Sequence, residues 1–224
     1  PSRRESFSFG PVYLPIVRRR SLPDRANSRF VRQRHGRSAS TRRRTASYSR
    51  YMESLKGRLL VAAPSLFDFF RRTVVLVVEH TDQGAFGVIL NRRADTEVAE
   101  LVPDLGPLVE QGAPLWVGGP VGPDSIVVLG DFNHPDQSAG VVEGSIGVVD
   151  PDGDADFSRA RVFVGHAGWG PGQLEGEVER DSWIVSDFDP DDVFSEGDLW
   201  AEVVRRPGGE LAILATMPDD PTLN

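Results

Sequence analysis

The sequence predicts an α+β fold, in which many short strands form a mixed, largely antiparallel sheet with short flanking helices. Apolar runs of strand length alternate irregularly with short helical segments, and hairpin signals outnumber complete strand–helix–strand units. A doubly wound parallel fold would instead need strand and helix to alternate regularly along the chain. No internal repeat of the length that solenoids or propellers use is visible.

Several apolar runs have the length and composition of strands. The run at 73–79 is β-branched and does not alternate, which predicts a strand buried on both faces. Polar residues and a glycine separate it from the run at 85–91, which predicts a hairpin. The predicted strands are 58–64, 73–79, 85–91, 115–123, 125–130, 146–149, 161–165 and 182–186.

The helix signals are short and lie between these strands. A helix is predicted at 95–102, with Asp95 as its N-cap. Another is predicted to begin at Pro171, because proline suits the first helical position. The remaining helical segments are a turn at 65–72, a turn at 189–194, a helix at 196–206 and a stretch at 211–217 that could be helix or strand.

Composition indicates a protein of the reducing cell interior. The 224 residues are 39% hydrophobic and include no cysteine, which suits one domain with or without a tail. No uninterrupted apolar run exceeds the length of Val74–Val78, whereas a membrane helix needs roughly 18 residues. We therefore expect a cytoplasmic protein that has no membrane partner.

Charge divides the chain into a basic arm and an acidic core. Residues 1–51 hold 14 arginines, no lysine and two acids, which gives a net charge of +12. Residues 52–224 hold 11 basic and 31 acidic residues, which gives −20. The boundary predicts one folded domain at 52–224 and a separate N-terminal arm at 1–51.

We expect the arm to be disordered, because it has no apolar periodicity and is rich in Arg and Ser. Its composition resembles an organelle transit peptide, and it would also suit a nucleic-acid-binding arm. The interpretation that we favour is an over-extended start, with Met52 as the true first residue.

Three stretches in order resemble one family. They are "GRLLVAAPSLFDFFRRTVVLVVEHTDQGAFGVILNR", "LWVGGPVGPDSIVVLG" and "VFVGHAGWGPGQLEGEVERDSWIV", and together they span most of the acidic core. They resemble the AlgH/YqgE family, a group of unknown function named for an association with transcriptional regulation of a polysaccharide pathway. The resemblance implies an α+β fold whose sheet is curled into a pseudo-barrel. The chain departs from the family pattern at Arg93, where proline is usual, and at His166, where tyrosine is common.

Four polar residues suggest a candidate centre. Glu79 and His80 end a predicted strand, and His166 and Glu175 flank the glycine-rich stretch around Trp169. If the fold joined these regions, two His and two Glu could bind a divalent metal or act as acid and base. No closely spaced metal-binding pattern supports this, so we favour a structural role, with Glu79 capping a turn and His166 packed under the loop.

The motif around Trp169 also admits an anion site. Gly170 and Gly172 bracket a predicted helix start, where free N–H groups favour a negative ligand. The glutamates of that helix would oppose a phosphate, so we favour glycines that serve the packing of Trp169. The complete candidate ligand-binding set is Glu79, His80, Asn91, His166, Trp169, Gln173 and Glu175.

Other glycine- or acid-rich stretches do not match known ligand motifs. The segment at 117–125 lacks the lysine of a P-loop, and the acidic loop at 150–161 lacks the glycine position of an EF-hand. No nucleophile-elbow pattern occurs. The sequence therefore predicts neither a cofactor nor a metal.

The hypothesis that we favour is a non-enzymatic regulatory protein that binds an unidentified protein or small molecule. The alternative is a metal-assisted hydrolase that uses the four polar residues named above. Direct DNA binding by the core is not expected, because a domain of charge −20 repels the phosphate backbone.

Overall fold

The computed structural model describes residues 8–9, 12–13, 17–18, 54–66, 68–154, 156–206, 208 and 211–215. Within the arm these are three two-residue strands, β1 (Ser8–Phe9), β2 (Val12–Tyr13) and β3 (Val17–Arg18). The rest of the arm lies outside the described residues, so its disorder stays a prediction. In the part of the chain that is described, no helix is both long enough and apolar enough to cross a bilayer.

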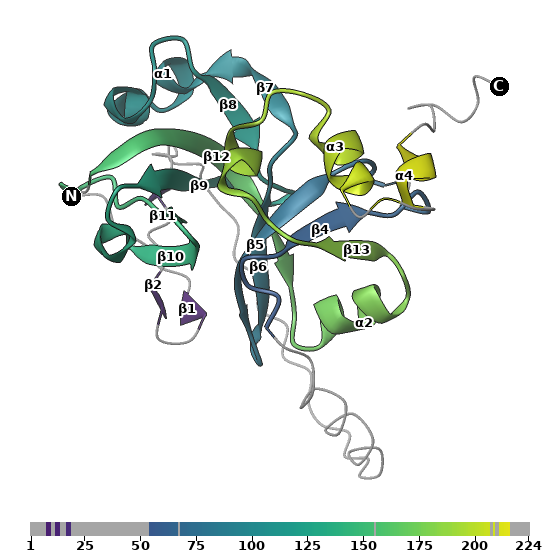
Figure 1. Cartoon of the computed structure of the whole chain (residues 1–224). Coiled ribbons are helices and arrows are strands. Elements are labelled where there is room, and N and C mark those ends of the chain that lie inside the picture. The colour runs from purple at the N-terminus through teal and green to yellow at the C-terminus, as the bar shows by residue number, and fades with distance from the viewer. Residues whose placement is uncertain are drawn as a thin grey trace, which may run out of the picture.

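The predicted α+β class is confirmed (Figure 1). The main sheet follows the order β10-β11-β9-β12-β6-β5-β4-β13, and β3, β7 and β8 join it at the side. Its pairs are antiparallel except for β8 with β12, which is parallel. The strands are β4 (Leu59–Ala62), β5 (Val74–Thr81), β6 (Gly84–Ile89), β7 (Arg93–Glu97), β8 (Pro114–Val117), β9 (Val121–Phe132), β10 (Gly140–Glu143), β11 (Ile146–Val148), β12 (Phe157–Trp169) and β13 (Trp183–Ser186).

Short helices flank the sheet. Figure 1 shows α1 beside β7 and β8 at one side of the sheet and α2 at the other. The helices are α1 (Val98–Leu101), α2 (Gln173–Glu179), α3 (Leu199–Arg205) and α4 (Leu211–Leu214), with 3-10 turns η1 (Pro103–Leu108), η2 (Pro135–Gln137) and η3 (Pro190–Phe194).

Two predicted helix starts are wrong. Asp95 does not cap a helix, because β7 runs to Glu97 in pairing with β8 and leaves only α1 as helix. The strand pairing outweighs the local cap signal. Pro171 precedes α2 instead of opening it, since the N-cap is Gly172 with a φ of 73°. The turn at 65–72 forms no regular helix in its described residues.

Both faces of the sheet are buried in its central part. On β5, Leu76 faces a core that also contains Phe163 and Trp200, whereas Val75 and Val77 face a second core under α2. The predicted burial of 73–79 on both faces is therefore confirmed. β10 lies at one end of the sheet and contacts β5, which is an inner strand of the same sheet. The sheet therefore curls around the first core without closing.

The two halves of the sheet meet where β12 changes partners. β12 pairs first with β9 and then, from Ala167 onward, with β6. A bulge at Gly165, with a φ of 68°, bends the strand between the two. The loop before β9 crosses this bend so closely that a Cβ on Gly119 would lie 2.2 Å from the backbone carbonyl of His166. The glycines of two sequence motifs thus permit direct backbone contact at the junction.

A methyl group at this crossing should unfold the junction. Gly119 has a φ of 156°, so Gly119→Ala combines a strained backbone with a clash against a carbonyl that cannot move away. We expect a loss of about 3 kcal/mol or more in the free energy of unfolding, measured by urea denaturation. Gly168→Ala, on the same strand, meets no atom closer than 3.7 Å and should change stability little. Equal losses in the two variants would contradict this explanation.

Candidate functional site

Trp169 lies in a buried indole pair that shares one carboxylate. Its Nε1 and the Nε1 of Trp183 each donate to Oε2 of Glu177 at 2.8 Å. The two rings pack edge to face with centroids 6.0 Å apart, and Trp169 is 5% exposed. The other oxygen of Glu177 accepts from Gln173 at 2.9 Å. This arrangement ties α2 to β12 and β13.

Gln173 also closes the loop that the anion hypothesis invoked. Its Oε1 accepts from the backbone N–H of Gly170 at 3.1 Å, while its Nε2 donates to Glu177. One of the donors that an anion would need is therefore bonded within the protein. The glycine-rich stretch here serves a side-chain network that fixes the start of α2.

His80 and Glu175 come together, as one half of the predicted centre. The backbone N–H of Leu55 donates to His80 Nδ1 at 2.9 Å, so the neutral ring carries its proton on Nε2. That nitrogen lies 3.1 Å from Glu175 Oε1 and donates to it. Both ring nitrogens are thus engaged, and the imidazole links the chain before β4 to α2.

Glu79 and His166 lie on the other face of the sheet. A bulge on β5 between Val77 and Glu79 places Glu79 opposite Phe86, which faces the first core. His80 is then opposite Ala85, which faces the core under α2. The carboxylate of Glu79 contacts Lys56 Nζ at 3.1 Å.

The four polar residues therefore form two separate groups. In the described residues, no three or more His, Asp or Glu side chains are grouped so that they could hold a metal ion. The structure does not bring together the centre that the hydrolase hypothesis requires.

Asn91 joins two strand ends and contacts no other candidate. Its Oδ1 accepts from the N–H of Val74 at 3.0 Å, and its Nδ2 donates to the carbonyl of Arg72 at 2.8 Å. These bonds fasten the start of β5 to the end of β6. We see in them a structural use of this residue.

His166 differs from His80 in having one ring nitrogen without a hydrogen-bond partner among the described residues. Ser125 donates its hydroxyl hydrogen to the carbonyl of Gly122 at 2.6 Å, so it accepts from His166 Nδ1, 3.3 Å away. Nε2 is then unprotonated. Burial lowers the pKa of His166, and the ring stays neutral at neutral pH.

The imidazole of His166 is buried and lies next to the exposed Gly168. Val121 pairs with His166 across β9 and β12 and is 45% exposed. A Cβ on Gly168 would lie 3.7 Å from Cδ2 and 3.9 Å from Nε2 of His166, and 4.0 Å from Val121. Because Gly168 has no side chain, this edge of the ring is left uncovered. We call Val121, His166 and Gly168 the Val121 patch.

Sequence reasoning missed two residues that define this surface. Ser125 sets the tautomer of His166 from 41 positions away, and Val121 supplies the apolar exposure. No short motif connects either residue to His166, because the contact depends on the register of β9 with β12. The aromatic contact of His166 with Phe86, at a centroid distance of 4.8 Å, depends in the same way on β6.

The fold and the site define a class of small α+β domains with an open, curled sheet and a glycine-lined strand crossing. The chain belongs to the AlgH-like family, which matches residues 59–212. A UPF0301 protein of Streptomyces coelicolor is 41% identical over 189 residues, covering 77% of this chain and 97% of that protein. A UPF0301 protein of Thermobifida fusca is 43% identical over 191 residues, covering 76% and 96%.

Solved structures agree with the family assignment. A crystal structure of a protein from Corynebacterium diphtheriae is similar with a TM-score of 0.66 and 34% identity, covering 74% of this chain and 94% of that one. The solution structure of the AlgH protein from Pseudomonas aeruginosa is similar with a TM-score of 0.57 and 28% identity, covering 74% and 95%.

Removing the shared carboxylate should destabilise the fold. Glu177→Ala leaves two buried indole N–H groups without an acceptor, and we expect a loss of about 2–4 kcal/mol in the free energy of unfolding. Glu179→Ala, on the exposed side of the same helix, is the matched control and should change stability by less than about 0.5 kcal/mol. Urea denaturation followed by tryptophan fluorescence measures both, and a silent Glu177→Ala would refute the role of the carboxylate.

Acid should destabilise the protein through His166. The unfolded residue titrates near a pKa of about 6.5, and burial lowers the folded pKa below that value. Between the two values the unfolded state binds more protons, so the free energy of unfolding falls as the pH drops below about 6.5. Above that pH this residue adds no dependence.

Denaturation at a series of pH values in His166→Gln measures this effect. The variant should lose the part of the slope below about pH 6.5 that His166 contributes. The control His134→Gln removes an exposed histidine and should keep the wild-type slope. Identical slopes in His166→Gln and the wild type would exclude His166 as the source.

Proposed function

We propose that this chain is a cytoplasmic, non-enzymatic binding protein that takes a protein partner on the Val121 patch. The observation that carries the proposal is that a glycine lies beside His166 at a position, 168, where the backbone does not require one. The backbone of Gly168 is not in the left-handed region, and an added Cβ would make only ordinary contacts. The fold therefore does not require glycine at position 168. A partner that contacts His166 does require it, because a larger side chain would cover the edge of the ring.

The surroundings of the patch support binding over catalysis. His80, Glu79 and Glu177 each make hydrogen bonds that hold the fold together. His166 has one acceptor nitrogen next to the exposed Gly168 and beside an exposed valine. Such a surface suits a partner that offers an apolar side chain next to a hydrogen-bond donor.

A regulatory role follows from this mode of action. A protein that binds without chemistry affects its partner by occupying a surface, and the family name carries an association with regulation. The hydrolase alternative has weaker support, because His80 and Glu175 lie on the opposite face from Glu79 and His166. Direct DNA binding remains unexpected for a core of net charge −20.

A large side chain at position 168 should abolish binding without unfolding the protein. A photo-crosslinking amino acid at position 121, in cells of the native host, should give a discrete crosslinked product with the partner. Adding Gly168→Leu should reduce that product about tenfold or more, because the side chain covers the imidazole edge and the valine. The melting temperature of the variant should stay near that of the wild type.

Two controls separate this outcome from general effects. Gly170→Leu places the same side chain on another exposed motif glycine, whose Cβ would have no neighbour closer than 3.9 Å, and should leave crosslinking unchanged. The crosslinker at Val141, another exposed valine, should give no such product. Equal products at 121 and 141, or crosslinking unaffected by Gly168→Leu, would overturn the proposal.

A further inference from the structure

Arg161 is a buried arginine in an aromatic setting, five residues before His166 on β12. Its side chain points toward the first core, and the residue is only 7% exposed. The guanidinium carbon lies 3.8 Å from the ring centroid of Trp116 and 5.9 Å from that of Phe194. Nη1 donates to the carbonyl of Ser195 at 3.0 Å. These contacts fix the plane of the guanidinium group.

One edge of this guanidinium keeps its hydrogen-bonding capacity. The bond to Ser195 uses Nη1, and no other hydrogen bond of the side chain is formed with the described residues. Among those residues, no fully buried side-chain nitrogen or oxygen lacks a partner. Nε and Nη2 are therefore not fully buried. These two nitrogens form the edge with which arginine binds a carboxylate or phosphate through two parallel bonds.

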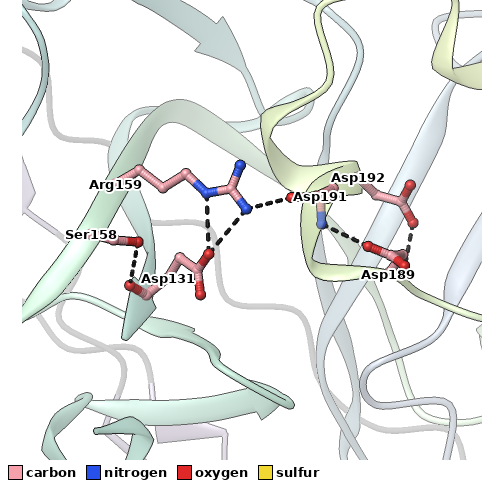
Figure 2. Close-up of polar contacts among 6 residues, drawn as sticks. All are labelled: Asp131, Ser158, Arg159, Asp189, Asp191 and Asp192. Carbon is pink, nitrogen blue, oxygen red and sulfur yellow. Dashed lines mark hydrogen bonds and ion pairs between the residues drawn. The ribbon is translucent and has the colours of Figure 1, made fainter. Parts of the chain in front are cut away.

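The guanidinium group of Arg161 has no carboxylate partner among the described residues. In the core, acids outnumber bases 31 to 11, and several arginines that the structure describes are paired with carboxylates. Figure 2 shows Arg159, two residues away, between the carboxylates of Asp131 and Asp191. Arg206 is likewise paired with Asp192. By contrast, Arg161 forms no ion pair within the described part of the chain.

Arg161 lies near one acid and two other cations. Burial is the main reason that the pKa of Arg161 is lowered to about 10; the charge of Glu196 acts to raise this pKa, and the charges of Arg159 and Arg93 act, more weakly, to lower it. Arg93 pairs with Trp116 across β7 and β8, so it lies beside the same ring. Its side chain is exposed and makes no ion pair with a described residue. An anion between Arg93 and Arg161 would relieve this repulsion.

We propose that the Nε–Nη2 edge of Arg161, together with Arg93, binds one oxyanion group, a carboxylate or a phosphate, of a small ligand. Trp116 holds the guanidinium plane, and Arg93 adds a second positive charge from the exposed side. Glu196 opposes the ligand because its exposed carboxylate is near enough to influence Arg161. This site is independent of the Val121 patch and of the proposed partner.

The test observes the site itself, because the arginine-rich arm would also bind anions. Sodium phosphate and sodium acetate are titrated into the full chain at constant ionic strength, with chloride as the reference. The NMR signals of Arg161 Nε–H and Trp116 Nε1–H are followed. We expect a saturable shift of both signals; saturation by one salt or by both identifies the group that is bound. Saturation by neither would overturn the proposal.

Substitutions at three exposed residues should change the apparent affinity for the anion in different ways. Arg93→Gln should weaken the apparent affinity about fivefold, because it removes one attractive charge. Glu196→Gln should strengthen it, because it removes a repulsive one. Arg205→Gln, an exposed arginine on α3, is the matched control and should have no effect. Equal affinity in Arg93→Gln and Arg205→Gln would refute the site.

Discussion

The fold depends on one place where two backbones touch. The loop before β9 crosses β12 at Gly165 and His166, and only glycine at position 119 allows that approach. At the same bend β12 leaves β9 and pairs with β6, so this contact joins the two halves of the sheet. A side chain between the backbones would separate the halves and with them the two cores. This constraint explains three of the motif glycines, Gly118, Gly119 and Gly165.

The same constraint determines which polar groups are available for function. Once β12 bends at Gly165, Trp169 turns toward α2, where Glu177 satisfies its indole, and His166 turns toward Phe86. On the α2 side, His80, Glu175 and Glu177 all form hydrogen bonds within the protein. What remains open is one nitrogen of His166 beneath Gly168. A surface of this kind offers a recognition contact more readily than a set of reacting groups.

Arg161 has no carboxylate partner in the part of the chain that the structure describes, and this is notable because the core around it is rich in acids. In a domain with nearly three acids for each base, the exposed guanidinium groups of Arg159 and Arg206 pair with carboxylates. Arg161 instead packs on Trp116 and meets a backbone carbonyl. The ring of Trp116 and the carbonyl of Ser195 hold the guanidinium group, and its Nε and Nη2 form no hydrogen bond with a described residue. A ligand with an anionic group would neutralise the charge of Arg161 and accept the hydrogen bonds that its guanidinium group does not form within the described residues.

The sequence alone determined the local elements, because apolar runs and their punctuation act over a few residues. Most of the strands, the β5–β6 hairpin, the α+β class and the family motifs were predictable in this way, whereas β7 and β10 were not. The faces of the sheet were decided only by the tertiary structure. One bulge after Val77 sends Glu79 toward the first core and His80 toward α2, so residues adjacent in sequence serve different sides. Bulges, strand register and the partners of Ser125 or Arg161 depend on pairing between distant segments, and no local pattern encodes them.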